Sequence, residues 1–227
     1  LKQFMGTLYN VYGFLVLYAN VDGINPAECN LPVSERPLMD RWILSRFNSL
    51  TKKVRDEMEQ YNITTATRAI GEFVDELSNW YVRRSRDRFW GTKVGVDKPV
   101  ACNPLYQVLV GTANLLAPFT PFIAEEIYQN LVRSFDSDAP ESVHLCDYPE
   151  ADERLINEEL ESDMERVRNL VVMGRAARNR AKVKIRQPLS AITVSARSDA
   201  ERESISRLMD LILEELNVRE ARFAEDV

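Results

Sequence analysis

The chain has 227 residues, of which 45% are hydrophobic and 28% charged, and its formal net charge is −6. This composition excludes disorder throughout the chain, and the lack of a run of about 18 apolar residues argues against a membrane-spanning helix. The three cysteines lie more than forty residues apart, which argues against a disulfide framework or a CxxC-type zinc site and is typical of a cytoplasmic protein.

The spacing of apolar residues predicts a mainly α-helical bundle over residues 1–150. We expect a helix over the first twenty residues, a second from Pro37 to about Tyr61, a third with Asn62 as N-cap, a fourth with Asn103 as N-cap and Pro104 as its first residue, and a fifth from Phe122 to about Arg133. Pro118 is expected to end the fourth helix. Residues 134–153 are expected to form a loop with a short extended piece at 143–146.

The last third of the chain changes character. Residues 151–186 are predicted to form a connector and a long basic helix, from about Glu153 to Ala181, followed by an extended segment at 182–186 in which basic and apolar residues alternate. Residues 187–227 are predicted to form a small α/β module, with strands at 189–195 and 218–223 around a helix at 200–216. So short a module buries little surface, so we expect it to be truncated and the chain to be a piece of a longer protein.

The known catalytic motifs are absent. The sequence contains no GxGxxG, P-loop, GxSxG or HExxH pattern. Its single histidine, His144, cannot form a two-histidine metal site. We therefore expect no catalytic residue, no metal site and no cofactor in this chain, and we interpret it as a binding module.

Positive charge is concentrated in one part of this acidic chain. The segment Arg166–Arg197 contains nine Lys and Arg and no Asp or Glu. On a helix Arg168, Arg175, Arg178 and Lys182 fall within about 80° of one another, which predicts a continuous basic stripe. Cations are also favoured at a helix C-terminus, but nine of them exceed what a cap needs. The segment is therefore interpreted as a phosphate-binding surface.

A second segment, Trp80–Trp90, combines four arginines with four aromatic residues. This composition is typical of sites that stack unpaired bases and bind their phosphates. Alternatively, Trp80 and Tyr81 belong to the core, which we favour for the aromatic residues, and the arginines pair with nearby carboxylates. For the arginines both interpretations stay open.

A third segment lies around Asp40. The predicted apolar stripe of its helix leaves Arg41, Ser45 and Asn48 on an outward face, with Arg46 beside them. These side chains carry hydrogen-bond donors that can read base edges. Most amphipathic helices expose such residues, so this pattern alone is a weak indication.

Five segments resemble the anticodon-binding region of isoleucyl-tRNA synthetases: DRWILSR at 40–46, NWYVRRSRDRFWG at 79–91, LLAPFTPFIAEEIYQNL at 115–131, SVHLCDYPE at 142–150 and KVKIRQPL at 182–189. Their order and spacing match as well, and together they span nearly the whole chain. APFTPFIAEE also resembles valyl- and leucyl-tRNA synthetases. YVRRSRDRFWG followed by KIRQPL resembles the isoleucine enzymes specifically.

The resemblance implies a helical bundle that binds the anticodon stem and loop of an isoleucine-accepting tRNA and is appended to a Rossmann-type catalytic domain. The parent enzyme is implied to be a monomeric isoleucine–tRNA ligase that uses ATP and Mg²⁺, with Zn²⁺ in the C-terminal region of some members. The HIGH and KMSKS motifs of that family are absent. The catalytic and editing domains are therefore expected outside this chain, which alone should be inactive.

The charge pattern and the resemblance together define the predicted site. We predict that Arg41, Arg46 and Asn48 read anticodon bases. Seven cationic residues are predicted to bind the tRNA backbone: Arg83, Arg84, Arg88, Arg175, Arg178, Lys182 and Lys184. Two alternatives stay open. One is the same module from a valyl- or leucyl-tRNA synthetase, and the other is a helical protein-interaction scaffold without RNA binding, which leaves the acid-free basic segment unexplained.

Overall fold

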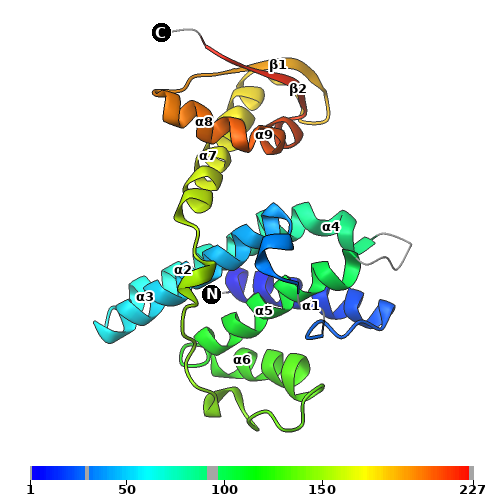
Figure 1. Ribbon diagram of the computed structural model, residues 1–227, viewed down its shortest axis with the longest axis vertical. Coiled ribbons are helices and arrows are strands. Elements are labelled where there is room, and N and C mark those ends of the chain that lie inside the picture. The colour runs from blue at the N-terminus through cyan, green and yellow to red at the C-terminus, as the bar shows by residue number, and fades with distance from the viewer. Residues whose placement is uncertain (1, 29–30, 91–96, 225–227) are drawn as a thin grey trace. The chain divides into compact units, whose positions relative to one another are not determined.

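The structure, a computed structural model of the chain, describes residues 2–28, 31–90 and 97–224. It divides the chain into two compact units, Leu1–Ile156 (unit 1) and Asn157–Val227 (unit 2). Among the described residues most are helical, and the strands belong to unit 2 (Figure 1). The mainly α-helical class with a small α/β module is thus confirmed. The division into 1–150, 151–186 and 187–227 stays a prediction.

Unit 1 is a bundle of helices connected by loops. Its elements are α1 (Lys2–Asp22), the 3₁₀ turn η1 (Val33–Glu35), α2 (Leu38–Glu59), α3 (Ile63–Glu76), the π-helix η2 (Leu77–Val82), α4 (Arg83–Trp90), α5 (Asp97–Leu116), α6 (Pro121–Tyr128), the π-helix η3 (Gln129–Arg133), and the 3₁₀ turns η4 (Val143–Leu145) and η5 (Glu153–Leu155). The first and second predicted helices are confirmed, and so is the end of the fourth predicted helix before Pro118. The fifth is also confirmed, as α6 continued by η3.

The third predicted helix is one continuous helical segment that contains a π-helix. It follows Asn62, whose side chain makes no capping hydrogen bond although it occupies the N-cap position. Between α3 and α4 the helix is wider, because η2 is a π-helix with more residues per turn than an α-helix. The consecutive residues Trp80, Tyr81 and Val82 are all buried there. The core interpretation of Trp80 and Tyr81 is therefore confirmed.

The predicted start of the fourth helix is wrong. Helix α5 begins at Asp97, so Pro104 lies inside it. Asn103 is not a cap, because its side chain donates a hydrogen bond to the carbonyl oxygen of Pro26 (2.8 Å) and accepts one from Nη2 of Arg36 (3.1 Å). These contacts with the loop before α2 override the local start signal.

Two further boundaries differ from the prediction. The piece expected to be extended at 143–146 is the 3₁₀ turn η4. The long helix α7 (Glu158–Arg180) starts five residues later than expected, because the side chain of Asn157 accepts a hydrogen bond from the backbone N–H of Leu160 (2.9 Å) and caps its first turn.

Helix α2 is the central helix of unit 1, in contact with α3, α5, η2 and η5. The consecutive residues Trp42, Ile43 and Leu44 are all buried, which a helix packed on one side alone cannot achieve. Where α2 meets α5, a Cβ atom added to Gly111 would lie 2.2 Å from Cζ of Phe47. A side chain at this position of α5 would force the ring of Phe47 to move. The predicted outward face at Ser45 and Asn48 is wrong, because both are buried here.

Unit 2 contains α7, β1 (Leu189–Val194), α8 (Asp199–Arg207), α9 (Met209–Leu216) and β2 (Val218–Phe223). The two strands pair in parallel, with Leu189 opposite Val218, and α8 and α9 form the crossover that parallel strands need. Both predicted strands are confirmed. The single helix expected at 200–216 is interrupted at Leu208. Residues 182–186 form turns rather than an extended segment.

A buried carboxylate joins α7 to α8. Asp163 is 3% exposed and accepts hydrogen bonds from Nε of Arg207 (2.8 Å), Nη1 of Arg166 (3.2 Å) and Oγ of Ser204 (2.5 Å). Burial alone would raise the pKa of Asp163. The hydrogen bonds from Arg207 and Ser204 and the charges of Arg207 and Arg166 outweigh it and hold this pKa below its ordinary value of 3.8.

The stability of unit 2 is therefore expected to fall in acid. A carboxyl with a lowered pKa stabilises the folded state above its unfolded pKa, and this contribution is lost as the pH falls through the folded pKa. Asp163→Asn should be less stable than the parent at pH 7 and should lose less stability between pH 4 and pH 2. Hydrogen exchange of the α7 amides measures both effects. Asp210→Asn, at an exposed position of α9, is the control and should match the parent at pH 7; an Asp163→Asn profile parallel to that of the parent would contradict the assignment.

Candidate nucleic-acid interface

The α2 residues predicted to read bases lie in different environments. Arg41 is exposed. Arg46 is partly exposed and forms an ion pair with Glu76, with 3.2 Å between Nε and Oε2. Asn48 is 6% exposed; its Nδ2 donates to the carbonyl oxygen of Leu44 (2.8 Å), and its Oδ1 accepts from the N–H of Asp152 (2.8 Å). Its amide thus ties the 152 loop to α2. Arg41 and Arg46 stay predictions as base-reading residues.

Arg88 belongs to a buried network rather than to the surface. Its Nη1 and Nη2 donate to the two carboxylate oxygens of Asp40 (2.8 and 3.1 Å), and the hydroxyl of Tyr81 donates to the same carboxylate (2.8 Å). Asp40 is 0% exposed. Burial and the neighbouring carboxylate raise the pKa of Tyr81 well above its ordinary value. A bidentate partner thus already holds the guanidinium of Arg88, which argues against a phosphate contact there.

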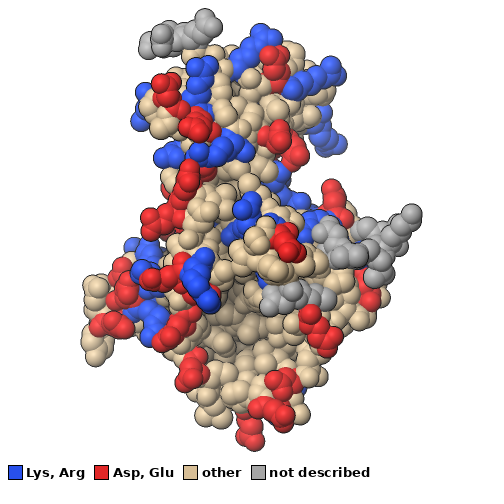
Figure 2. All heavy atoms as spheres, in the orientation of Figure 1, with Lys and Arg blue, Asp and Glu red and all other residues tan. Residues whose placement is uncertain are grey.

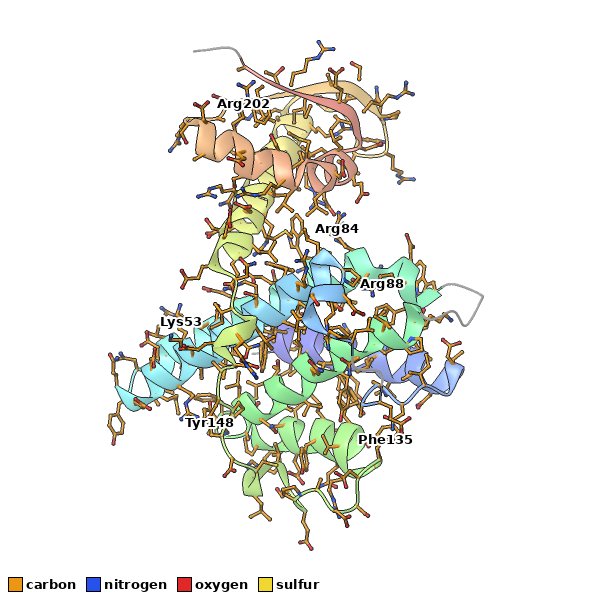
Figure 3. The ribbon with its side chains drawn as sticks, in the orientation of Figure 1. Lys53, Arg84, Arg88, Phe135, Tyr148 and Arg202 are labelled. Carbon is orange, nitrogen blue, oxygen red and sulfur yellow. The ribbon has the colours of Figure 1, made fainter. Side chains whose placement is uncertain are left out.

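The outer surface of α4 carries cations beside indole rings. Arg83 and Arg84 are half-buried on this helix, where Figure 3 labels Arg84, and both stay predicted phosphate contacts. Nε of Arg83 donates to the carbonyl oxygen of Asn79 (2.7 Å), and its guanidinium lies 6.0 Å from the ring centroid of Trp80. The guanidinium of Arg86 lies 5.9 Å from the ring centroid of Trp90, which is 53% exposed. Arg86 and Trp90 therefore present a cation and an aromatic face together at the surface.

In unit 2 the structure does not form the predicted continuous stripe. Arg175 pairs with the buried carboxylate of Glu215, 2.5 Å away, and Arg166 pairs with Asp163. Arg178 is 6% exposed, and its guanidinium donates to backbone carbonyl groups. On the face of unit 2 that Figure 2 shows, Lys and Arg alternate with Asp and Glu and form no uninterrupted band. The side chain of Arg175 is 46% exposed although it is ion-paired, so its contact with phosphate stays a prediction. The burial of Arg178 argues against a direct phosphate contact of its own.

Four cations remain accessible where α7 ends. Arg180, Lys182, Lys184 and Arg186 are exposed, and none of them has an ion pair within the part of unit 2 that the structure describes. We call residues 180–186 the basic turn. The basic turn contains Lys182 and Lys184, which were predicted to bind the tRNA backbone. It also contains Arg180 and Arg186, which were not among the predicted contacts.

Sequence reasoning missed the burial of Arg178, although a signal was present. The buried residues of α7 follow the spacing Met164, Val167, Val171, Gly174, Arg178. This three- and four-residue step places Arg178 on the inner face of the helix. No comparable local signal separates Trp90 from Trp80, because their burial depends on which helices pack against η2 and α4.

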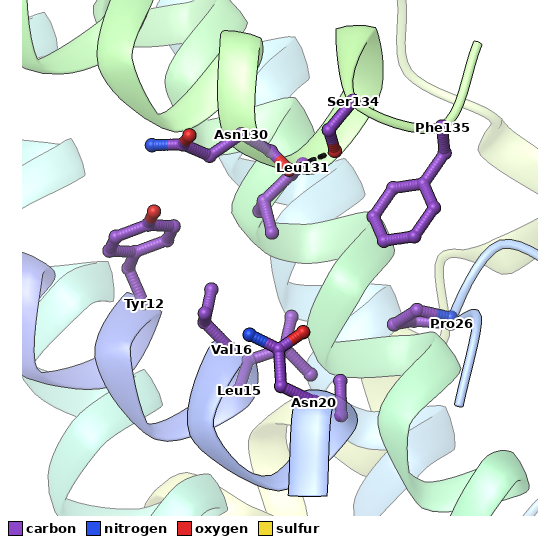
Figure 4. A pocket seen from close by; sticks show the side chains of 10 residues that line it. Tyr12, Leu15, Val16, Asn20, Pro26, Asn130, Leu131, Ser134 and Phe135 are labelled. Atoms are coloured by element: carbon purple, nitrogen blue, oxygen red, sulfur yellow. Dashed lines mark hydrogen bonds between the residues drawn. The ribbon is translucent and has the colours of Figure 1, made fainter. Parts of the chain in front are cut away.

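A cavity of about 300 Å³ lies in unit 1 between α1 and residues 130–135 (Figure 4). Tyr12 and Val16 of α1 face Leu131 and Phe135 across it. Its lining residues include no Lys or Arg. The cavity therefore does not suit a phosphate group and lies outside the candidate interface.

The basic turn is an accessible cluster of positive charge in an otherwise acidic chain. Residues 40–193 match the family model described as the anticodon-binding domain of tRNA ligase. The match covers more than half of the chain, so the chain belongs to the family of anticodon-binding domains of tRNA ligases.

Relatives extend this likeness over the whole chain. The chain is 49% identical over 226 residues to the isoleucine–tRNA ligase of Clostridium tetani, covering 100% of this chain and 21% of the relative. It is 50% identical over 218 residues to that of Dehalococcoides mccartyi, covering 96% of this chain and 21% of the relative. Identity to the enzyme of Thermus thermophilus is 47% over 226 residues, covering 99% of this chain and 22% of the relative. The chain thus spans about a fifth of the length of these relatives. Among the described residues, no helix has the length and hydropathy to cross a membrane.

Proposed function

We propose that this chain is the part of an isoleucine–tRNA ligase that binds the anticodon stem and loop of an isoleucine-accepting tRNA. The observation that carries the proposal is the near 50% identity to isoleucine–tRNA ligases over the full length of the chain. The exposed cations of the basic turn and Arg86 on α4 supply positive charge that attracts RNA phosphates. Arg41 and Arg46 on α2 are the proposed base-reading residues.

The whole protein is proposed to attach isoleucine to this tRNA with ATP and Mg²⁺, as a cytoplasmic monomer, with Zn²⁺ as a further ion of its C-terminal region. These cofactors belong to the rest of the protein in this proposal. The role of the present chain is to bind one end of the tRNA, so that the acceptor end reaches the distant active site.

Titration with a fluorescent isoleucine-accepting tRNA tests the proposal. The chain should bind it more tightly than the same tRNA with a swapped anticodon, and both affinities should fall between 50 and 200 mM salt, because each neutralised phosphate releases condensed cations. Equal affinity for the two tRNAs would place the binding away from the anticodon. No binding at either salt concentration would favour the protein-interaction scaffold.

Within this function, Trp90 is proposed to stack on an unpaired base. Replacing Trp90 with Ala should lower tRNA affinity by about fivefold, near the lower end of the range for one base–aromatic stack, because the ring is only 53% exposed. Trp90→Phe keeps an aromatic face and should retain most of the affinity.

Acrylamide quenching separates stacking from an indirect effect of this substitution. Trp42 and Trp80 are 1% and 9% exposed, so quenching reports mainly on Trp90. Saturating tRNA should protect this fluorescence. Undiminished quenching in the tRNA complex would exclude the stack while leaving tRNA binding itself intact.

A further inference from the structure

The C-terminus of α7 has a Schellman motif with an unusual residue in it. The N–H of Lys182 donates to the carbonyl oxygen of Asn179 (3.1 Å), and the N–H of Val183 donates to that of Arg178 (3.0 Å). These are the two hydrogen bonds of the motif, whose left-handed position is usually glycine. Here that position is Lys182, with φ of 56°. A side chain there costs about 1 kcal/mol or more relative to glycine, so its presence needs an explanation other than stability.

Beneath the basic turn, the buried guanidinium of Arg178 binds the backbone of the turn. Nη2 donates to the carbonyl oxygens of Lys184 (2.7 Å) and Gln187, and Nη1 donates to that of Leu216 at the end of α9 (3.0 Å). Nδ2 of Asn217 donates to the carbonyl oxygen of Ile185 (3.0 Å). The turn is thus fixed from its inner side, and Lys182, Lys184 and Arg186 are exposed on it.

Helix capping does not account for these exposed cations. A helix C-terminus favours nearby positive charge because its last carbonyl groups lack partners. Here the Schellman hydrogen bonds satisfy the carbonyl groups of Arg178 and Asn179, and Arg178 already brings a cation to the end of the helix. Arg180, Lys182, Lys184 and Arg186 therefore remain as surplus positive charge, and no Asp or Glu occurs between Arg166 and Arg197.

We propose that the basic turn is a binding site for RNA phosphates and that Arg178 is its positioning residue. The proposal rests on the proposed function and deepens it, because it names the residues of unit 2 that contact the phosphates of the same tRNA and the residue that positions them. Lys182 contacts a phosphate from the left-handed position, and Lys184 and Arg186 contact its neighbours. Arg178 touches no phosphate and acts by holding the carbonyl groups that set the shape of the turn.

Lys182→Gly is the decisive variant, because glycine favours the left-handed backbone and removes the charged side chain. Its melting temperature should equal or exceed that of the parent. Its tRNA affinity should fall about threefold at 100 mM salt, and the slope of log affinity against log salt should become shallower by about 0.7–0.9, as expected for one lost phosphate contact. Arg222→Gln is the control, since it removes an exposed cation of unit 2 that is already paired with Glu220, and its slope should match that of the parent.

Arg178→Lys tests the positioning role. Lysine keeps the positive charge, but its single ammonium group cannot donate to the same set of carbonyl oxygens as the planar guanidinium. We expect weaker tRNA binding by folded protein and faster hydrogen exchange at residues 183–187. Faster exchange with unchanged tRNA affinity would limit Arg178 to stability. If this variant does not fold, Lys182→Gly still decides whether the site exists.

The outcomes separate this site from the proposed function. A parent chain that binds tRNA, together with a Lys182→Gly variant of unchanged affinity and salt slope, would overturn the site and leave the proposed function standing. A parent chain that shows no salt-dependent tRNA binding would overturn both.

Discussion

Replacing Arg88 with Met is expected to lower the free energy of unfolding of unit 1 by about 3–5 kcal/mol, because the substitution leaves a buried carboxylate without its ion-pair partner. Asp40 is fully buried, and both of its oxygens accept from Arg88. The hydroxyl of Tyr81 alone cannot compensate a full charge. The measurement is denaturant unfolding followed by tryptophan fluorescence, which reports on unit 1 because all three tryptophans lie there.

The matched control is Arg86→Met, two residues earlier on the same helix. Arg86 is exposed, so its loss should change stability by less than about 0.5 kcal/mol. The double variant Asp40→Leu, Arg88→Met removes both charges and should recover part of the loss. Equal effects of Arg86→Met and Arg88→Met would show that the network adds nothing specific to the fold.

The second large effect concerns two glycines within helices. Gly111→Ala should destabilise unit 1 by about 1–3 kcal/mol, because the added methyl group overlaps the ring of Phe47. Gly13→Ala should instead stabilise unit 1 by about 0.5–1 kcal/mol, since nothing lies within 4 Å of its added Cβ atom and alanine favours a helix. The two variants should therefore differ by about 1.5–4 kcal/mol, with opposite signs.

The same fluorescence-detected unfolding measures both glycine variants. A destabilised Gly13→Ala would indicate that α1 meets a neighbour there. A neutral Gly111→Ala would mean that Phe47, which also packs against Phe73 at 5.9 Å between ring centroids, moves aside without cost.

Local sequence pattern predicted the elements of the fold well. Helix-period spacing and proline positions located the first two helices, and both strands of unit 2 were located, whereas the alternation at 182–186 wrongly predicted an extended segment. The predicted helix boundaries were wrong where tertiary contacts overrode a local sequence signal. Asn103 and Pro104 resemble a helix start, but the partners of Asn103 lie in the loop before α2, far away in sequence.

The candidate site was less predictable than the fold, because the sequence does not show whether a charged side chain is exposed or ion-paired. Arg88 finds its partner 48 residues away at Asp40, and Arg175 finds its partner 40 residues away at Glu215. Neither pairing is visible in the spacing of either segment. Lys182 and Lys184 remained accessible, because they lie in a turn whose side chains are mostly exposed, Ile185 included.

The length of the π-helix η2 determines how α4 is rotated about its own axis, because α4 continues the same helical segment. One residue corresponds to about 100° of rotation in an α-helix, so a deletion of one residue within 77–82 would rotate α4 by that amount about its own axis. Phe89 would then take the place of Arg88 opposite the carboxylate of Asp40, and the indole of Trp90 would point in a new direction. The length of this one wide turn therefore decides both which arginine is buried and which aromatic ring is presented to a ligand.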